Sequence, residues 1–299
     1  MTDKHASHHV YPGHYPFAIA VIFNLGYTLI QAGFALSANS MSLLADAGHN
    51  LGDVLALMLA WGANWLLTLP TRQRYSYGFK RTTILAALTN ALFIVAAAVL
   101  IAYESILKLF HPLSMNAHIV IIVALIGIVI NSGTALLFMK GSKNDLNIKS
   151  AFYHLMSDAL ISLGVVIAAL LQLWTGTLWI DPIAGLLIVL IILQGTRGLL
   201  RDSITLLLDA VPHYINHHGV KQYLSQLPGV SAIHDLHIWG LSTREIALTA
   251  HLVMPEKTLS DEDYKNINQV LCNEYHIHHV TLQVEQGNLE HPCVIREQC

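Results

Sequence analysis

The chain has 299 residues, of which 54% are hydrophobic and only 12% are charged. Soluble domains usually carry about 25% charged residues, so this composition excludes an ordinary soluble protein and indicates a polytopic membrane protein. The net charge of −3 gives no reason to expect nucleic-acid binding. The chain has 18 histidines, whereas its three cysteines, Cys272, Cys293 and Cys299, make no disulfide framework and suit a reducing compartment or metal binding.

Six apolar runs follow a polar start, and each is long enough to cross a bilayer, which takes roughly 20 residues in a helix. The runs are Pro16–Leu36, Met41–Leu69, Thr83–Leu109, Ala117–Met139, Ser150–Trp174 and Ile180–Leu200. They predict a six-helix transmembrane bundle over residues 16–201, preceded by a tail of residues 1–15. The tail contains His5, His8, His9 and His14, for which metal binding and a merely tolerant tail composition are both open.

The basic residues are distributed unevenly over the connections between these runs. They lie after the second and fourth runs and at or just beyond the end of the sixth: Arg72, Arg74, Lys80, Arg81, Lys140, Lys143, Lys149, Arg197 and Arg201. The other three connections, residues 37–40, 111–116 and 175–178, contain no Lys or Arg. Because Lys and Arg favour the cytoplasmic side, we expect both termini to lie in the cytoplasm.

From about Asp202 the chain becomes more polar, and its pattern changes to that of a small α+β domain. We expect helices over 217–227 and 260–275, with Ser260 as the N-cap of the second helix, and strands over 230–239, 245–254 and 278–285. This αββαβ order predicts a ferredoxin-like domain over residues 202–285, with helices on one face of a sheet. A C-terminal tail of residues 286–299 follows.

Two of the apolar runs contain a histidine and an aspartate four residues apart. His49 and Asp53 lie in the second run, and His154 and Asp158 lie in the fifth. In a helix this spacing places both side chains of a pair on one face, one turn apart. Ionisable residues that face lipid are costly, so we expect these four to face the bundle interior or water. Two imidazole nitrogens and two carboxylates form a tetrahedral set suited to Zn²⁺.

A single pair of this kind could also be a buried polar contact that fixes helix packing, but the second copy favours a metal site. Asp46, three residues before His49, could cap its helix, line an exit path or act as a further ligand. Asn50 could support the site or only pack against a neighbouring helix.

Histidines also occur on the expected strands of the C-terminal domain. His234, His237 and His251 fall on the first two strands, and Glu285 falls on the third. Single histidines on strands are more often structural than metal-binding, so the residues alone leave both interpretations open.

Three longer motifs point to a known family. They are Ser42–His49 (SLLADAGH), Tyr77–Arg81 (YGFKR) and His234–Trp239 (HDLHIW). Together with the two His-x-x-x-Asp pairs, the six runs and the cytoplasmic domain, they make nearly the whole chain resemble a cation diffusion facilitator of the bacterial zinc-exporting branch.

This resemblance implies a homodimeric Zn²⁺/H⁺ antiporter in the inner (plasma) membrane that exports zinc, with Cd²⁺ or other divalent cations as secondary substrates, by alternating access. The family's transport ligands correspond to His49, Asp53, His154 and Asp158. Its copper-chaperone-like cytoplasmic domain binds regulatory zinc and supports dimerisation, and the matching positions are His234, His251 and Glu285. The family's loop metal site is not expected here, because Thr71–Tyr77 contains neither Asp nor His. The family also pairs a basic residue with an aspartate near the dimer hinge, which corresponds to Arg81 and Asp209, with Lys80 as the alternative base.

The chemistry of the four ligands itself supports antiport. Histidine must be neutral to bind Zn²⁺, so zinc and protons compete for the same groups. An enzyme is not expected, because there is no His-Glu-x-x-His motif and four ligands leave no open coordination position. A metal channel, or a metal-sensing membrane protein without antiport, remains the alternative.

Overall fold

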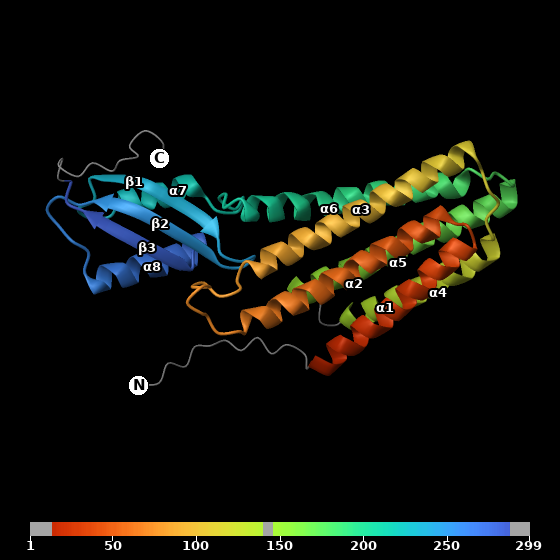
Figure 1. Ribbon diagram of the computed structural model, residues 1–299, viewed down its shortest axis with the longest axis horizontal. Coiled ribbons are helices and arrows are strands. Elements are labelled where there is room, and N and C mark those ends of the chain that lie inside the picture. Colours follow the sequence, from red (N-terminus) through yellow and green to blue (C-terminus); the bar gives the residue numbers. More distant parts are fainter. Residues whose placement is uncertain (1–13, 140–145, 288–299) are drawn as a thin grey trace. The chain divides into compact units, whose positions relative to one another are not determined.

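The structure is a computed structural model that describes the chain except residues 1–13, 140–145 and 288–299 (Figure 1). Six long helices form its first part: α1 (His14–Ser37), α2 (Met41–Leu67), α3 (Thr82–Phe110), α4 (Ala117–Met139), α5 (Leu146–Thr175) and α6 (Ile180–Leu207). Within the described residues, all but α1 meet the length and hydropathy needed to cross a membrane. The prediction of a six-helix bundle is confirmed in its six long helices, five of which have the length and hydropathy of membrane spans.

Contacts divide the described residues into two compact units. The first contains the chain up to Leu59 together with Asn90–Arg197, and the second contains Ala60–Thr89 together with the chain from Gly198. Three helices contribute to both units, since α2, α3 and α6 each cross one of these boundaries.

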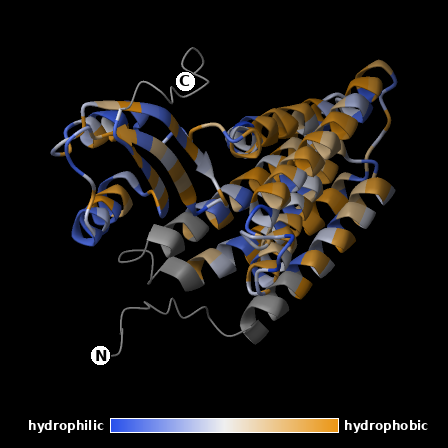
Figure 2. Cartoon of the chain, turned by 60° about the vertical axis from the view of Figure 1, so that its left-hand side comes forward, coloured by the Kyte–Doolittle hydropathy of each residue, from blue (hydrophilic) through white to orange (hydrophobic). Residues whose placement is uncertain are grey.

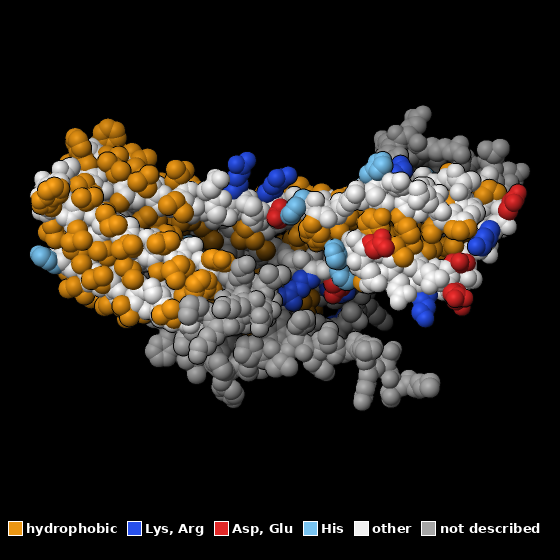
Figure 3. All heavy atoms as spheres, turned by 180° about the vertical axis from the view of Figure 1, so that it is seen from behind, with side chains coloured by type: hydrophobic (Ala, Val, Ile, Leu, Met, Phe, Trp, Pro, Cys, Tyr) orange, Lys and Arg blue, Asp and Glu red, His pale blue; other side chains and the backbone are white. Residues whose placement is uncertain are grey.

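Small residues let the helices of the first unit pack closely. Its fully buried core includes Ala35, Ala45, Ala98, Ala124 and Ala169. A Cβ placed on Gly52 of α2 would lie 2.8 Å from Ile94 Cγ1 of α3, so any larger residue would force the Ile94 side chain to shift. Large apolar side chains such as Leu100 and Leu190 are exposed. Hydrophobic residues run along the long helices in Figure 2, and hydrophobic side chains cover much of the helical part in Figure 3, as contact with lipid requires.

A buried carboxylate fixes the beginning of α2. Asp181, in the first turn of α6, accepts hydrogen bonds from the Ser40 hydroxyl (2.6 Å), the Met41 N–H (2.6 Å) and both the N–H (3.2 Å) and hydroxyl (2.6 Å) of Ser42. These donors lie at the N-terminus of α2, where helical N–H groups have no partner within the helix. Asp181 therefore caps α2 from a different helix and sets the position of the residues that follow.

The C-terminal domain has the predicted αββαβ order. Its elements are α7 (His217–Ser225), β1 (Ala232–Gly240), β2 (Ile246–Val253), α8 (Asp261–Tyr275) and β3 (His279–Glu285). The strand order is β1-β2-β3, with β1 antiparallel and β3 parallel to β2. Leu224, Leu248, Leu252, Leu271 and Ile277 are fully buried in its core.

Helix α8 begins where the sequence predicts. The Ser260 hydroxyl accepts a hydrogen bond from the Asp263 N–H, and the Asp263 carboxylate accepts one from the Ser260 N–H. This reciprocal pair is a capping box. The helix ends at Tyr275, and the C-cap residue His276 adopts a left-handed conformation with φ 57°.

Candidate metal centres

The two His-x-x-x-Asp pairs meet between α2 and α5. His49 Nε2 on α2 lies 3.1 Å from Asp158 Oδ1 on α5, and His154 Nε2 on α5 lies 3.3 Å from Asp53 Oδ2 on α2. Within each helix the distances are longer, at 3.9 Å from His49 Nε2 to Asp53 Oδ2 and 3.7 Å from His154 Nε2 to Asp158 Oδ2. The four side chains thus form a closed ring in which imidazoles and carboxylates alternate.

The spacing of this ring suits a tetrahedral metal ion. Bonds of about 2.0 Å from Zn²⁺ place neighbouring ligand atoms about 3.3 Å apart, close to the distances between the ring's imidazoles and carboxylates. One ligand atom each from His49, Asp53 and Asp158 forms a set whose members all lie within 4.8 Å of one another. His154 lies outside this set of three, although its Nε2 is 3.3 Å from Asp53 Oδ2 and 3.7 Å from Asp158 Oδ2, and its ring centroid lies 6.1 Å from that of His49.

Exposure falls steadily across the ring. The side chain of His154 is 49% exposed and that of Asp53 24%, whereas His49 is 19% and Asp158 only 5% exposed. Two ionised carboxylates and two neutral imidazoles carry a charge of −2, which a divalent cation would neutralise. Such neutralisation is needed where charged groups lie inside a membrane-spanning bundle.

A second polar layer lies one helical turn beyond the ring. Asp46 Oδ2 accepts hydrogen bonds from Gln31 Nε2 (2.6 Å) and from the Ser162 hydroxyl (2.9 Å), and Asn50 Nδ2 donates to Gln31 Oε1 (3.0 Å). The sequence indicated Asp46 and Asn50 but not Gln31 or Ser162. The sequence spacing could have indicated Ser162, since it follows Asp158 by the same four residues that separate His154 from Asp158.

A second candidate metal centre lies on the sheet of the C-terminal domain. His234 on β1 and His251 on β2 are paired across the two strands, and Glu285 at the end of β3 pairs with Val253. Glu285 Oε2 lies 2.9 Å from His234 Nε2, and its Oε1 lies 2.8 Å from His251 Nδ1. The structure therefore brings together the three residues at the positions that the resemblance indicated.

The chemistry of this trio suits a cation. Although it lies near Glu285, the buried His251 Nδ1 has no hydrogen bond of acceptable geometry among the described residues, so a metal would give it a partner. Burial raises the pKa of the Glu285 carboxyl, but the hydrogen bond and charge of His234 and the charge of His251 outweigh it and hold the pKa below its usual range. His234, His251 and Glu285 could therefore hold one Zn²⁺ through two nitrogens and a carboxylate.

His237 does not belong to this trio. A bulge in β1 lies between His234 and His237, and Asp235 within it has a positive φ of 54°. Asp235 Oδ1 lies 2.9 Å from His237 Nε2, and its Oδ2 lies 3.4 Å from His251 Nε2. The bulge thus separates the two β1 histidines and places Asp235, which the sequence did not indicate as a site residue, next to His237 and His251.

Charged residues join the beginning of α3 to the C-terminal domain within the second unit. Arg81 Nη2 lies 2.6 Å from Asp209 Oδ1, which confirms the expected contact between these residues. Lys80 forms an ion pair with Glu245 just before β2, and the Thr243 N–H donates to the Thr83 hydroxyl (3.1 Å). Lys80, the alternative base for Asp209, thus pairs with Glu245 instead.

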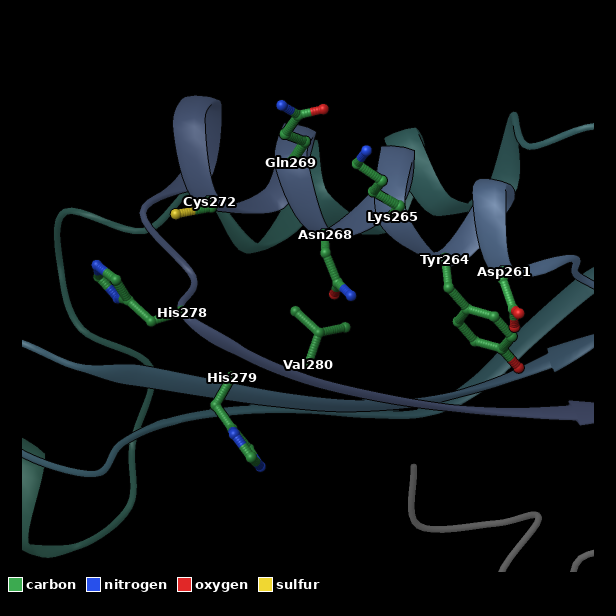
Figure 4. Close-up of a pocket in the computed structure, with 9 residues that line it drawn as sticks. All are labelled: Asp261, Tyr264, Lys265, Asn268, Gln269, Cys272, His278, His279 and Val280. Carbon is green, nitrogen blue, oxygen red and sulfur yellow. The ribbon is translucent and has the colours of Figure 1, made fainter. Parts of the chain in front are cut away.

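A pocket between α8 and the beginning of β3 is separate from the trio. Tyr264, Asn268 and Cys272 line it from one face of α8, and two further lining residues are His278, just before β3, and His279, the first residue of β3 (Figure 4). Within the described parts of the chain, its Cys, His and Asp side chains do not approach one another as a metal-binding set of three. His5, His8 and His9, and Cys293 and Cys299, lie outside the described residues.

Comparison with known proteins covers almost the whole chain. Residues 17–208 match the cation efflux transmembrane domain, and residues 212–287 match the cytoplasmic domain of cation efflux proteins. The cadmium, cobalt and zinc/H(+)-K(+) antiporter of Bacillus subtilis (strain 168) is 32% identical over 271 residues, which cover 89% of this chain and 87% of the relative.

Two further relatives have similar identity. The zinc transporter ZitB of Escherichia coli (strain K12) is 32% identical and covers 87% of this chain and 83% of its own length. The metal cation efflux system protein CzcD of Cupriavidus metallidurans is 32% identical, and the match covers 94% of this chain and 90% of that protein. A solved structure of the metal-bound C-terminal domain of the CzcD transporter is 32% identical, covers 24% of this chain and 99% of its own, and has a TM-score of 0.21.

Proposed function

Because the chain belongs to the cation efflux family, we propose that it exports Zn²⁺ from the cytoplasm in exchange for protons, by alternating access. The observation that carries this proposal is the ring of His49, Asp53, His154 and Asp158, in which neighbouring imidazole nitrogens and carboxylate oxygens lie 3.1, 3.3, 3.7 and 3.9 Å apart. Relatives described as zinc transporters, and one described as a cadmium, cobalt and zinc antiporter, support the choice of metal.

Exchange follows from the ligands. An imidazole binds Zn²⁺ only through an unprotonated nitrogen, so zinc binding releases protons from the ring and protonation releases zinc. If the ring opens alternately to the two sides of the membrane, a proton gradient directed inward moves zinc outward. A ring of four ligands without an open coordination position holds the ion and does not prepare it for catalysis.

The cytoplasmic trio has a different role in this proposal. Zinc bound by His234, His251 and Glu285 regulates the transporter, and the C-terminal domain of residues 202–285 joins two chains into a homodimer. The transport domain comprises residues 16–201, in the inner membrane with both termini in the cytoplasm. Regulation requires that zinc bind one arrangement of the two chains better than another.

Uptake of radioactive Zn²⁺ into proteoliposomes with an imposed pH gradient tests the proposal. Wild type is expected to accumulate zinc against its gradient, and Asp53→Ala and Asp158→Ala to lose this activity while still inserting and dimerising, because each loses one anionic ligand. Glu104→Gln is the matched control, since it removes a carboxylate from an exposed position on α3.

The same assay separates the alternatives. Zinc flux that follows only the zinc gradient, with no proton movement, would identify a channel. Binding without flux would identify a sensor. Near-normal uptake by either aspartate variant would remove these residues from the transport site.

A further inference from the structure

The contacts between α2 and α5 continue beyond the ring as a third level. The first level joins Asp53 to His154, the second joins His49 to Asp158, and the third joins Asp46 to Ser162. Exposure falls along this series, and Asp46 and Ser162 are both 0% exposed. Asp46 lies toward the 37–40 connection, on the side that we expect to face away from the cytoplasm.

The two oxygens of Asp46 have different surroundings. Oδ2 accepts both hydrogen bonds, from Gln31 and Ser162, while Oδ1 is buried and has no hydrogen-bond partner among the described residues. The Gln31 amide is oriented by Asn50, which donates to its oxygen, so its N–H points toward Asp46.

These surroundings balance the two protonation states of the carboxyl. Burial and the unpartnered Oδ1 favour the neutral acid, because an ionised carboxylate is costly inside a membrane-spanning bundle. The two donors on Oδ2 favour the anion. The titratable groups that face Asp46 are His49 on its own helix, Asp158 on α5 and Tyr27 on α1, whose hydroxyl donates to the Val123 carbonyl.

The charge of the neighbouring ring decides between the two states. When zinc leaves the ring and fewer than two imidazole protons replace its two charges, the carboxylates of Asp53 and Asp158 repel a further negative charge one turn away, and Asp46 holds a proton. With Zn²⁺ in the ring, its two positive charges are added nearby, and ionised Asp46 is favoured. Since coupling between two bound species is reciprocal, a proton on Asp46 weakens zinc binding by the same factor.

We propose that Asp46 binds one of the protons exchanged for zinc, taking it up when the ring is free of metal and releasing it to water when zinc binds. This inference rests on the proposed function and adds to it a proton site that is not a metal ligand. Asp46 does not touch the metal in this proposal, and it acts on zinc binding only through charge.

Asp46→Asn tests the proposal, because the amide has nearly the same shape and keeps an oxygen acceptor but cannot exchange a proton. In proteoliposomes we expect pH-driven zinc accumulation to fall at least about tenfold, since one coupled proton is lost. Exchange of radioactive Zn²⁺ for unlabelled Zn²⁺ without a pH gradient should stay within about twofold of wild type, because it needs only the metal ligands. Proton release on zinc binding should fall by up to one proton per ion.

Ser162→Ala is the second variant. It removes a donor to the anion, so the midpoint of the pH profile of zinc uptake should rise by roughly one unit. Ser105→Ala is the matched control, because Ser105 is equally buried and its hydroxyl has no hydrogen-bond partner among the described residues. Its pH profile should match that of wild type.

The outcomes separate this inference from the proposed function. If wild type does not exchange zinc for protons, the proposed function fails. If wild type does and Asp46→Asn keeps its pH-driven uptake and proton count, or loses both kinds of flux equally while folded, Asp46 is not a proton site. If Asp46→Asn does not fold, the Ser162→Ala profile decides, and an unshifted midpoint overturns the inference.

Discussion

Replacing Asp181 by alanine is expected to destabilise the helical bundle strongly. The change removes the acceptor for two hydroxyls, those of Ser40 and Ser42, and for the backbone N–H groups of Met41 and Ser42. The two hydroxyls already lie 3.2 Å apart and can bond to each other. The two N–H groups at the beginning of α2 are left buried without an acceptor.

The magnitude follows from this count. A hydrogen bond to a charged group contributes about 1.5–3 kcal/mol, so the loss of two should cost about 3–6 kcal/mol. Protein domains are stable by about 5–15 kcal/mol, so this is a large share of the total free energy of unfolding. Asp181→Asn keeps one acceptor oxygen and should lose about half as much.

Unfolding of the detergent-purified protein by heat and by denaturant, followed by tryptophan fluorescence, measures this loss. Asp202→Ala is the control, because Asp202 is half-exposed and lies 3.5 Å from His213, and exposed pairs of this kind contribute about 0–1 kcal/mol. A loss below about 1 kcal/mol for Asp181→Ala would refute the reasoning, because the four donors would then have other acceptors.

Three further predictions concern the ring, the ion pair and the cap of α8. His49→Asp replaces a nitrogen ligand by an oxygen, so a metal competition series should show broader selectivity and relatively more Cd²⁺ transport; an unchanged Zn²⁺/Cd²⁺ ratio would exclude His49 as a ligand. Charge reversal at Arg81 or at Asp209 should reduce zinc flux and reversal at both should restore it, and absence of rescue in this double-mutant cycle would leave the 2.6 Å contact without functional meaning. Hydrogen bonds from the N–H and then the hydroxyl of Ser260 hold the pKa of Asp263 below its usual range, so the ionised carboxylate stabilises α8 above the pKa of the unfolded chain, and this contribution is lost as the pH falls through the lower folded-state pKa. Asp263→Asn should therefore flatten the pH dependence of the unfolding midpoint below about pH 4, and parallel curves for the two proteins would contradict this.

Local patterns in the sequence account for the elements and for the pairs of candidate ligands. Apolar runs of spanning length predicted the helices, and alternation with capping residues predicted the αββαβ domain. The spacing of His49 and Asp53, and of His154 and Asp158, placed each pair on one helical face. These predictions succeed because they depend only on helical or strand geometry within a single element.

Other features depend on which elements lie next to one another, and the sequence does not encode this locally. Gln31 and Asp181 resemble any polar residue near the end of an apolar run, and only the packing of α1 on α2 and of α6 on α2 reveals their partners. Asp235 was missed for a different reason, since regular alternation does not predict the bulge that turns it toward His237 and His251.

The β1–β2 hairpin connects the cytoplasmic trio with the beginning of α3. His234 and His251 are paired near one end of the hairpin, and at the other end Thr243 and Glu245 contact Thr83 and Lys80. A fragment that contains only the C-terminal domain keeps all three ligands of the trio but lacks these two contacts. If the trio binds zinc as proposed, the zinc affinity of this fragment contains no contribution from moving α3. The ratio of the affinities of the fragment and the full-length chain would then measure the free energy that couples zinc at the trio to the membrane helices.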